Sequence, residues 1–447
     1  MLLRAGAMRG AVVNDNISSG ENLTMRAAIL ATGAAAVVAI VAGAVVMVGV
    51  SSANAQTRKA APPLELKGDA SARPWKRYPG WPARDYSKFN TLANLASAPA
   101  PKEPRKLPGP ITGDAAKGAE LVADRNRGGS CLACHVMGPA GGANLPGNVG
   151  PDLSEIGNAG REDGWLFNYV YDARVYNPDT VMPPWGGHGV FTDDEINDMV
   201  AFLKTLKSPA VFKTALDDPS KRPAPVEKRE NLDPLENPGM WALDKAQVLW
   251  KTRTSSGFAC HTCHNDPNTA FKSWAASMPK WEPRLNKVLG VEEFIARHAG
   301  ATIDVKWLME TDENRVMSVY LHSLANGAPI DVDTTSADAK AAISRGKALA
   351  ERKIGELNFA CTDCHGIAAN KWIRGQWLGE PKGQYDHFPT WRTSLLAIWD
   401  IRQRFQWCQV NIRADELPPD AKEYGDLELY LASLNEGLKL SVPGIRH

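Results

Sequence analysis

Three stretches of the chain repeat one order of apolar and polar positions. Each stretch opens with a helical pattern rich in Ala, Lys and Leu and closes with an amphipathic helix. The opening patterns cover 114–121, 242–249 and 337–349, and the closing helices end at 202–206, 320–324 and 430–434. Apolar residues at helical spacing predict helices that each bury one face. The pattern therefore predicts a mostly α-helical protein built from three similar units.

Each unit carries a Cys-x-x-Cys-His motif between its two helical patterns. The residues are Cys131, Cys134 and His135; Cys260, Cys263 and His264; and Cys361, Cys364 and His365. Two thiols three residues apart share one helical turn and can form thioethers with the two vinyl groups of a haem, while the next imidazole binds the iron. We therefore expect three covalent c-type haems. A zinc site is one alternative, but zinc ribbons need paired Cys-x-x-Cys knuckles, whereas a histidine follows every knuckle here. Disulfide bonds are a second alternative.

The haem motifs and the helical repeat together predict the fold of each unit. An N-terminal helix packed on a C-terminal helix around one haem is typical of class I cytochrome c, so three consecutive domains of this kind are expected. Their predicted ranges are 107–208, 238–332 and 333–447. The Pro-rich segment 56–106 is predicted to be an extended arm, and 209–237 a linker. The short boundary near 331–337 predicts that the last two domains are closely coupled.

The N-terminus predicts export from the cytoplasm. An apolar run over 27–50 follows Arg26, and the sequence SSANA that ends at Ala55 has the small-x-small form of a cleavage site. Cleavage there would give a periplasmic protein, whereas an uncleaved run is long enough to anchor the chain in a membrane. Residues 1–55 are thus interpreted as an extension with a signal peptide or anchor.

Charge and cysteine count narrow the function further. The formal net charge is +1, and this balance gives no indication of nucleic-acid binding. Of the seven cysteines, six belong to the motifs, which leaves Cys408. An odd cysteine in an exported protein indicates an intermolecular disulfide or a reactive thiol.

The first and second motifs are each followed by a candidate sixth ligand of the haem iron. Met182 lies in a Met-Pro-Pro loop before the last helix of the first unit, where its thioether would raise the reduction potential of the haem. The alternative is a methionine of the core. The second unit has no such loop, and His298 is the candidate there, with an ordinary surface or core histidine as the alternative.

Cys408 is the candidate sixth ligand of the third haem. It follows His365 at a spacing similar to that between His135 and Met182. A thiolate on the iron lowers the reduction potential. Arg404 lies four residues earlier, on the same face of a helix if this stretch is helical. An unpaired structural thiol or a disulfide with a partner is the alternative.

These residues resemble the SoxAX cytochromes of bacterial sulfur oxidation, as a fusion of a SoxX-like monohaem part and a SoxA-like dihaem part. The resemblance rests on 150–153, 177–183 and 194–196 in the first part and on 374–376, 388–389, 404–408, 413–414, 427–431 and 443–446 in the last. The Arg404-to-Arg413 segment is its specific portion, because the haem motifs alone fit many cytochromes.

The resemblance implies an activity and its residues. SoxAX-type cytochromes couple thiosulfate oxidatively to a cysteine thiol of the carrier SoxYZ, and two electrons pass to a c-type cytochrome acceptor. Cys408 matches the cysteine that binds the catalytic haem iron, often as a persulfide, and Arg404 matches its neighbouring arginine. His298 stands where dihaem SoxA proteins commonly place another cysteine. This departure leaves the catalytic site intact but puts the relay role of the second haem in doubt.

A chemical hypothesis follows for the third unit. Thiosulfate and a thiolate are both anionic, so their approach needs a cationic site. Arg404 is expected to hold the anion, and Arg392, Arg402 and Arg413 are further candidates, or else a solvated basic face. Cys408 is expected to form a transient thiosulfonate that passes to the carrier. The alternatives are a tetrathionate-forming thiosulfate dehydrogenase and a multihaem electron carrier without catalysis.

Overall fold

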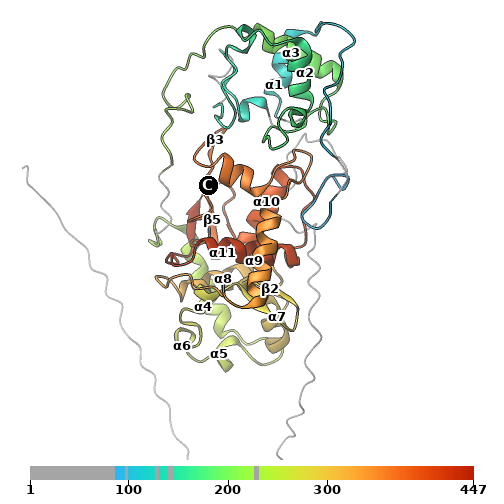
Figure 1. Ribbon diagram of the computed structural model, residues 1–447. Coiled ribbons are helices and arrows are strands. Elements are labelled where there is room, and N and C mark those ends of the chain that lie inside the picture. Colours follow the sequence, from blue (N-terminus) through green and yellow to red (C-terminus); the bar gives the residue numbers. More distant parts are fainter. Residues whose placement is uncertain (1–85, 96–98, 126–129, 139–144, 226–230, 447) are drawn as a thin grey trace, which may run out of the picture. The chain divides into compact units, whose positions relative to one another are not determined.

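The computed structural model describes residues 86–95, 99–125, 130–138, 145–225 and 231–446 (Figure 1). The predicted signal or anchor, 1–55, and the arm up to residue 85 lie outside this part of the chain. None of the helices in the described ranges is both long and apolar enough to cross a bilayer. The predicted fold class is confirmed: the described chain is mostly helical, with a few short strands.

The first unit is built on helices α1 (Ala115–Ala123), α2 (Asp163–Asp172) and α3 (Asp193–Thr205) (Figure 1). Short helical turns complete it: η2 (Cys131–Ala133), η4 (Ile156–Asn158) and η5 (Ala173–Val175). Thr192 and Glu195 cap the start of α3 reciprocally. The α1–α3 crossing is close, because a Cβ atom added at Gly118 would lie 2.0 Å from the carbonyl oxygen of Asp198.

The second unit runs from η6 (Pro238–Met240) to α8 (Asp312–Ser323). Between them lie α4 (Trp241–Lys251), α5 (Cys260–Cys263), α6 (Pro267–Phe271), η7 (Ala275–Ser277), β1 (Lys280–Glu282), β2 (Lys287–Leu289) and α7 (Val291–Ile303). Strands β1 and β2 form an antiparallel hairpin, and α4 packs against α8. The predicted opening and closing helices of this unit are thus α4 and α8.

The third unit places α9 (Ala337–Ala350) against α11 (Lys422–Leu434), and α10 (Ile401–Asn411) lies before α11 (Figure 1). Its other elements are η8 (Asp363–Ile367), β3 (Trp372–Ile373), β4 (Gln376–Trp377), β5 (Thr390–Arg392), β6 (Ala397–Trp399) and β7 (Gly444–Arg446). Strand β5 pairs antiparallel with β6 and parallel with β7. Strand β7 therefore lies at one edge of a three-stranded sheet with β5 at its centre.

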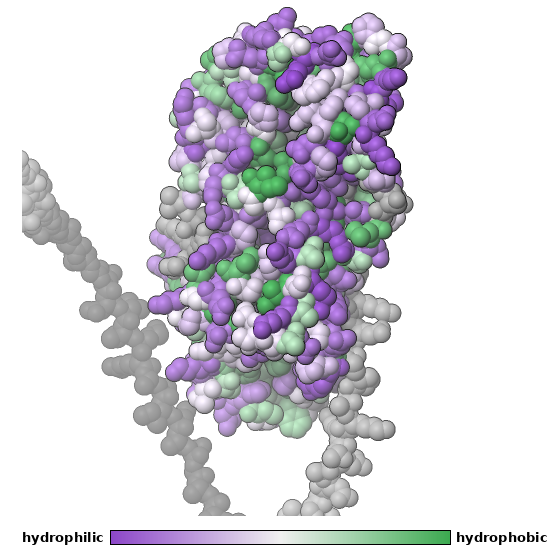
Figure 2. All heavy atoms as spheres, in the orientation of Figure 1, coloured by the Kyte–Doolittle hydropathy of each residue, from purple (hydrophilic) through white to green (hydrophobic). Residues whose placement is uncertain are grey.

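The last two units share one hydrophobic core. Buried residues of the second unit, such as Val288 and Met317, belong to the same cluster as Ala342 and Leu429 of the third. The first unit has its own cluster, which includes Leu132 and Met199 but also Leu357 and Phe359 from the third unit. Polar side chains cover most of the face that Figure 2 shows, with apolar residues scattered among them.

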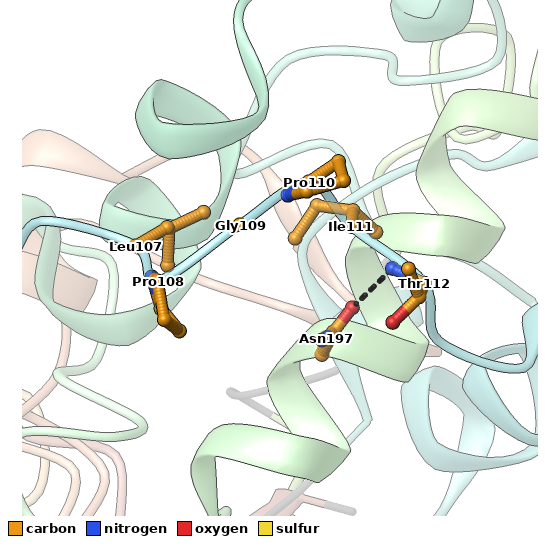
Figure 3. Close-up of a pocket in the computed structure, with 7 residues that line it drawn as sticks. All are labelled: Leu107, Pro108, Gly109, Pro110, Ile111, Thr112 and Asn197. Carbon is orange, nitrogen blue, oxygen red and sulfur yellow. Dashed lines mark hydrogen bonds between the residues drawn. The ribbon is translucent and has the colours of Figure 1, made fainter.

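The start of the first unit and the linker after it both make defined contacts. Residues 107–112 lie along α3, where Asn197 Oδ1 accepts hydrogen bonds from the backbone N–H groups of Thr112 at 3.2 Å and Gly113 at 3.0 Å (Figure 3). The residues that line the pocket here are apolar apart from Thr112 and Asn197. In the linker, Arg222 donates to the carbonyl oxygen of Arg374 at 2.7 Å and lies over the Trp372 ring at 4.8 Å.

Candidate active site

One cavity of about 1160 Å³ collects the predicted residues of the third unit. Its lining includes Cys361, Cys364, His365, Arg404 and Cys408. The volume exceeds the range of about 300–1,000 Å³ that is usual for small-ligand pockets. A cavity of this size, bounded by both thiols and the imidazole of one motif, fits a covalently attached haem.

Helix α10 presents Arg404 and Cys408 to this cavity because its other faces are tied into the protein. Asp400 caps its first turn through the backbone N–H of Gln403. Gln406 donates to the carbonyl oxygen of Leu417 at 3.0 Å, and Gln409 donates to the Tyr424 hydroxyl at 2.5 Å. These hydrogen bonds hold α10 in place, and Arg404 and Cys408, four residues apart, share the face that lines the cavity.

His365 is prepared to bind a metal through one nitrogen. Its Nδ1 lies 2.8 Å from the carbonyl oxygen of Gly379, which makes Nδ1 the donor and leaves Nε2 free. Burial lowers the pKa of His365, and the nearby positive charge of Arg404 lowers it further. The ring is therefore neutral, as a metal-binding imidazole must be.

The cysteines of the third motif lie close to Cys408. Burial raises the pKa of Cys361 and Cys364 to about 12, and Cys408 is the next largest cause in both cases. Cys134 of the first motif also contributes to the raised pKa of Cys364. The third motif therefore lies close to Cys408, with which it shares the cavity, and to Cys134 of the first motif.

In the first motif, a backbone carbonyl oxygen holds the histidine ring in the same way as in the third. His135 Nδ1 lies 2.7 Å from the carbonyl oxygen of Pro151. A Cβ atom at Gly150 would lie 2.3 Å from His135 Cε1, so only glycine lets this loop cover the ring. Met182 packs against the same apolar cluster as Cys131, and its backbone N–H donates to Thr180 Oγ1 at 3.1 Å.

The second motif faces His298 across a short gap. The ring centroids of His264 and His298 are 5.9 Å apart, and Phe294 stacks on His298 with 5.1 Å between centroids. Burial lowers the pKa of His298, and the neighbouring His264 lowers it further. The structure therefore places His298 beside the histidine of the second motif.

The three additional arginine candidates have different positions. Arg392 lines the cavity of the third unit. Arg402 is fully buried between Glu428 at 2.7 Å and Glu293 at 2.9 Å. Arg413 forms an equally buried ion pair with Glu356 at 2.6 Å. The expectation that Arg402 and Arg413 add to the field of the site is therefore wrong, because buried carboxylates neutralise both charges.

Sequence reasoning missed two residues of the cavity wall. His387 and Arg446 line the cavity and lie next to each other, with His387 Nδ1 3.3 Å from Arg446 Nη2 and 3.0 Å from Asp386 Oδ1. The 388–389 and 443–446 segments had entered the resemblance, but their spacing along the chain gave no indication that β5 and β7 pair side by side.

Two cytochrome families match different parts of the chain. Residues 245–330 match the SoxA/TsdA cytochrome c domain, and residues 113–203 match the family described as cytochrome C oxidase, cbb3-type, subunit III. Both matches contain a Cys-x-x-Cys-His motif. Because both families are cytochromes, the chain carries covalent haem c.

Curated relatives match about half of the chain. The L-cysteine S-thiosulfotransferase subunit SoxA of Pseudaminobacter salicylatoxidans is 28% identical over 224 residues, which cover 49% of this chain and 78% of the relative. The protein of the same name from Chlorobaculum thiosulfatiphilum is 29% identical over 232 residues, with coverages of 52% and 78%. The crystal structure of SoxXA from P. pantotrophus aligns with 25% identity and a TM-score of 0.45, over 48% of this chain and 80% of that one.

Proposed function

We propose that this chain, which joins a SoxA/TsdA cytochrome c domain to a second cytochrome c domain, is a haem-dependent L-cysteine S-thiosulfotransferase that oxidises thiosulfate. The observation that carries the proposal is the placement of Cys408 and Arg404 on one face of α10, in the cavity of the third motif. A plain electron carrier needs neither a cysteine nor an arginine there.

The reaction joins two sulfur atoms and releases two electrons. Thiosulfate and the cysteine thiol of a SoxYZ-type carrier give a cysteine S-thiosulfonate, one proton and two electrons. The bound haems supply the one-electron acceptors for this oxidation, and a c-type cytochrome is the acceptor beyond the chain. We propose three covalent haems, which the Cys131, Cys260 and Cys361 motifs would hold, and Met182, His298 and Cys408 are the further residues that would bind iron.

In this proposal, Arg404 binds thiosulfate and Cys408 reacts with it. The guanidinium of Arg404 holds the thiosulfate dianion through charge-assisted hydrogen bonds. The Cys408 thiolate forms a bond to the outer sulfur of thiosulfate, and two electrons are released. The carrier thiol then gives up its proton, and its thiolate attacks that outer sulfur and expels the Cys408 thiolate, so the thiosulfonate group moves to the carrier.

The contact between the first and third units supports the first unit as the electron exit. The Arg374 N–H donates to the carbonyl oxygen of Ala133 at 2.8 Å, and the Asn148 N–H donates to that of Trp372 at 3.0 Å. Trp372 donates back to Asn148 Oδ1 at 2.8 Å. A thiolate ligand in the third unit and a thioether in the first would make this transfer favourable, because the former lowers the potential and the latter raises it.

Supplying thiosulfate with and without the carrier tests the activity. We expect thiosulfate alone to deliver no more than the two electrons of one turnover to the haems. Continued haem reduction and a carrier mass increased by one thiosulfonate group should require both thiosulfate and the carrier. Tetrathionate formed at the same rate without the carrier would instead assign the chain as a thiosulfate dehydrogenase. A haem spectrum that thiosulfate and carrier together leave unchanged would mean an electron carrier without this chemistry.

Intact-mass spectrometry of the purified protein tests the cofactors and the processing. We propose export to the periplasm with cleavage after Ala55, so the expected mass is that of residues 56–447 with three haems. A mass that retains residues 1–55 would contradict cleavage. A mass with two haems would contradict one of the three attachments, and an added sulfur atom would identify a persulfide.

A further inference from the structure

A short loop between α9 and the third motif, residues 352–359, contacts both the first and the third unit. Lys353 lies near its start. The Lys353 ammonium donates to Asp363 Oδ1 at 3.0 Å, inside the third motif, and to the carbonyl oxygen of Thr180 at 3.1 Å in the first unit. Thr180 precedes Met182 by two residues and binds the Met182 N–H through its hydroxyl. One cation thus joins the Met182 loop to the third motif.

The environment of this cation holds it in place. The Asp363 side chain is 3% exposed and also accepts a hydrogen bond from the Ala360 N–H at 2.7 Å. The Lys353 side chain is 27% exposed. A buried carboxylate left without its partner is strongly unfavourable, so the pair cannot open as an exposed ion pair can. The Lys353 carbonyl oxygen is fixed too, because Asn90 Nδ2 donates to it at 3.2 Å.

The far end of the same loop makes a second connection. His188, six residues after Met182, is buried, and its Nδ1 lies 2.6 Å from the carbonyl oxygen of Glu356. The Glu356 carboxylate binds Arg413, which follows α10, the helix of Cys408. Loop 352–359 therefore contacts the segment around Met182 at two points, through Lys353 and through Glu356. The same two residues contact Asp363 and Arg413 of the third unit.

We propose that Lys353 tunes the first and third haem sites together by neutralising the Asp363 carboxylate that lies between them, so that both reduction potentials fall when its charge is lost. Oxidation adds positive charge to a haem, and a nearby carboxylate without its cation favours that change. The inference rests on the haem attachments of the proposed function but not on its sulfur chemistry.

The test compares midpoint potentials of the purified trihaem protein in a spectroelectrochemical titration. Lys353→Met keeps the length of the side chain and removes its charge. Lys117→Met is the matched control, because Lys117 pairs with Asp198 within the first unit. Lys353→Arg keeps the charge. We expect both potentials to fall in Lys353→Met by about a tenfold change in the reduction equilibrium, which is about 59 mV for one electron.

Lys117→Met and Lys353→Arg are expected to retain potentials near those of the parent protein. Unchanged potentials in Lys353→Met would overturn the inference, and so would a shift at only one of the two sites. An equal shift in Lys353→Arg would also overturn it, because geometry rather than charge would be responsible. Haem content measured on each variant separates these outcomes from a failure of haem attachment, and no thiosulfate is needed.

Discussion

Cys408 and Arg404 share one face of α10, yet the loss of each should have a different kinetic effect. For Cys408→Ser, we expect all three haems to remain attached, because no attachment thiol changes. Turnover should fall by about a hundredfold or more, the scale of losing a group that reacts in the transition state. Mass spectrometry of the carrier measures the product. The matched control is Asn411→Ser on the same helix, and undiminished turnover in Cys408→Ser would refute its role.

Arg404→Ala should act mainly on substrate binding. A hydrogen bond to a charged group contributes about 1.5–3 kcal/mol, so the KM for thiosulfate should rise about tenfold to a hundredfold. Steady-state kinetics at varied thiosulfate concentration provide the measurement. Arg404→Lys should recover part of the loss, because a lysine keeps the charge but not the bidentate fork. An unchanged KM in Arg404→Ala would contradict the assignment.

His298→Met tests the second haem. Exchanging an imidazole ligand for a thioether should replace the bis-histidine spectrum of this haem and raise its potential. Optical and electron paramagnetic resonance spectra of the ferric protein report the change. His261→Asn, inside the same motif, is the control and should leave the spectrum as it is. If His298→Met retains a bis-histidine signal, another residue is the ligand.

Among single residues, the sequence predicted those that belong to a Cys-x-x-Cys-His motif and those that lie on the same helix face as Cys408. It failed for Arg402 and Arg413, which look like solvated cations but are buried against carboxylates. Their partners Glu293, Glu428 and Glu356 lie far away along the chain, so no local pattern could indicate the pairing.

Among the elements, the crossing of α1 and α3 depends on Gly118. Gly118→Ala would place a methyl group 2.0 Å from a backbone oxygen, and such overpacking costs about 1–3 kcal/mol. Thermal unfolding should therefore shift to lower temperature. Gly164→Ala in α2 is the control, because its Cβ meets nothing within 4 Å. Equal unfolding temperatures for the two variants would mean that the crossing can relax.

The paired helices were predictable from the sequence because each carries a full amphipathic repeat. Helix α9 spans Ala337–Ala350, close to the expected 337–349. The strands were not predictable, because β3 and β4 have two residues each and show no alternation. Strand β7 pairs with β5 from a distant part of the chain, and this pairing is what brings Arg446 into the cavity wall.

For the molecule as a whole, buried carboxylates between the last two units predict a pH effect. Burial raises the pKa of Glu292 to about 8, with Asp400 and Glu428 adding to the rise. The folded protein thus holds a proton that the unfolded chain releases near its ordinary value of about 4.3. Stability from this group is full below that value and is lost as pH rises towards 8.

Glu292→Gln should remove that pH dependence, because the amide stays neutral. The slope of unfolding free energy against pH between 5 and 8 should become less negative than in the parent protein. Chemical denaturation at several pH values measures it, with Glu313→Gln at the start of α8 as the control. Parallel slopes for Glu292→Gln and the parent would rule out this carboxyl as the source.

The linker between the first and second units affects how the first unit associates with the third. Arg222 fixes the linker to the same β3–β4 hairpin that contacts the first motif. In separate subunits, docking would depend on the concentration of each partner. Within one chain, the effective concentration of the first unit at the hairpin is set by the linker alone. Dilution should therefore leave electron transfer between these units unchanged, and the two should always be present in equal number.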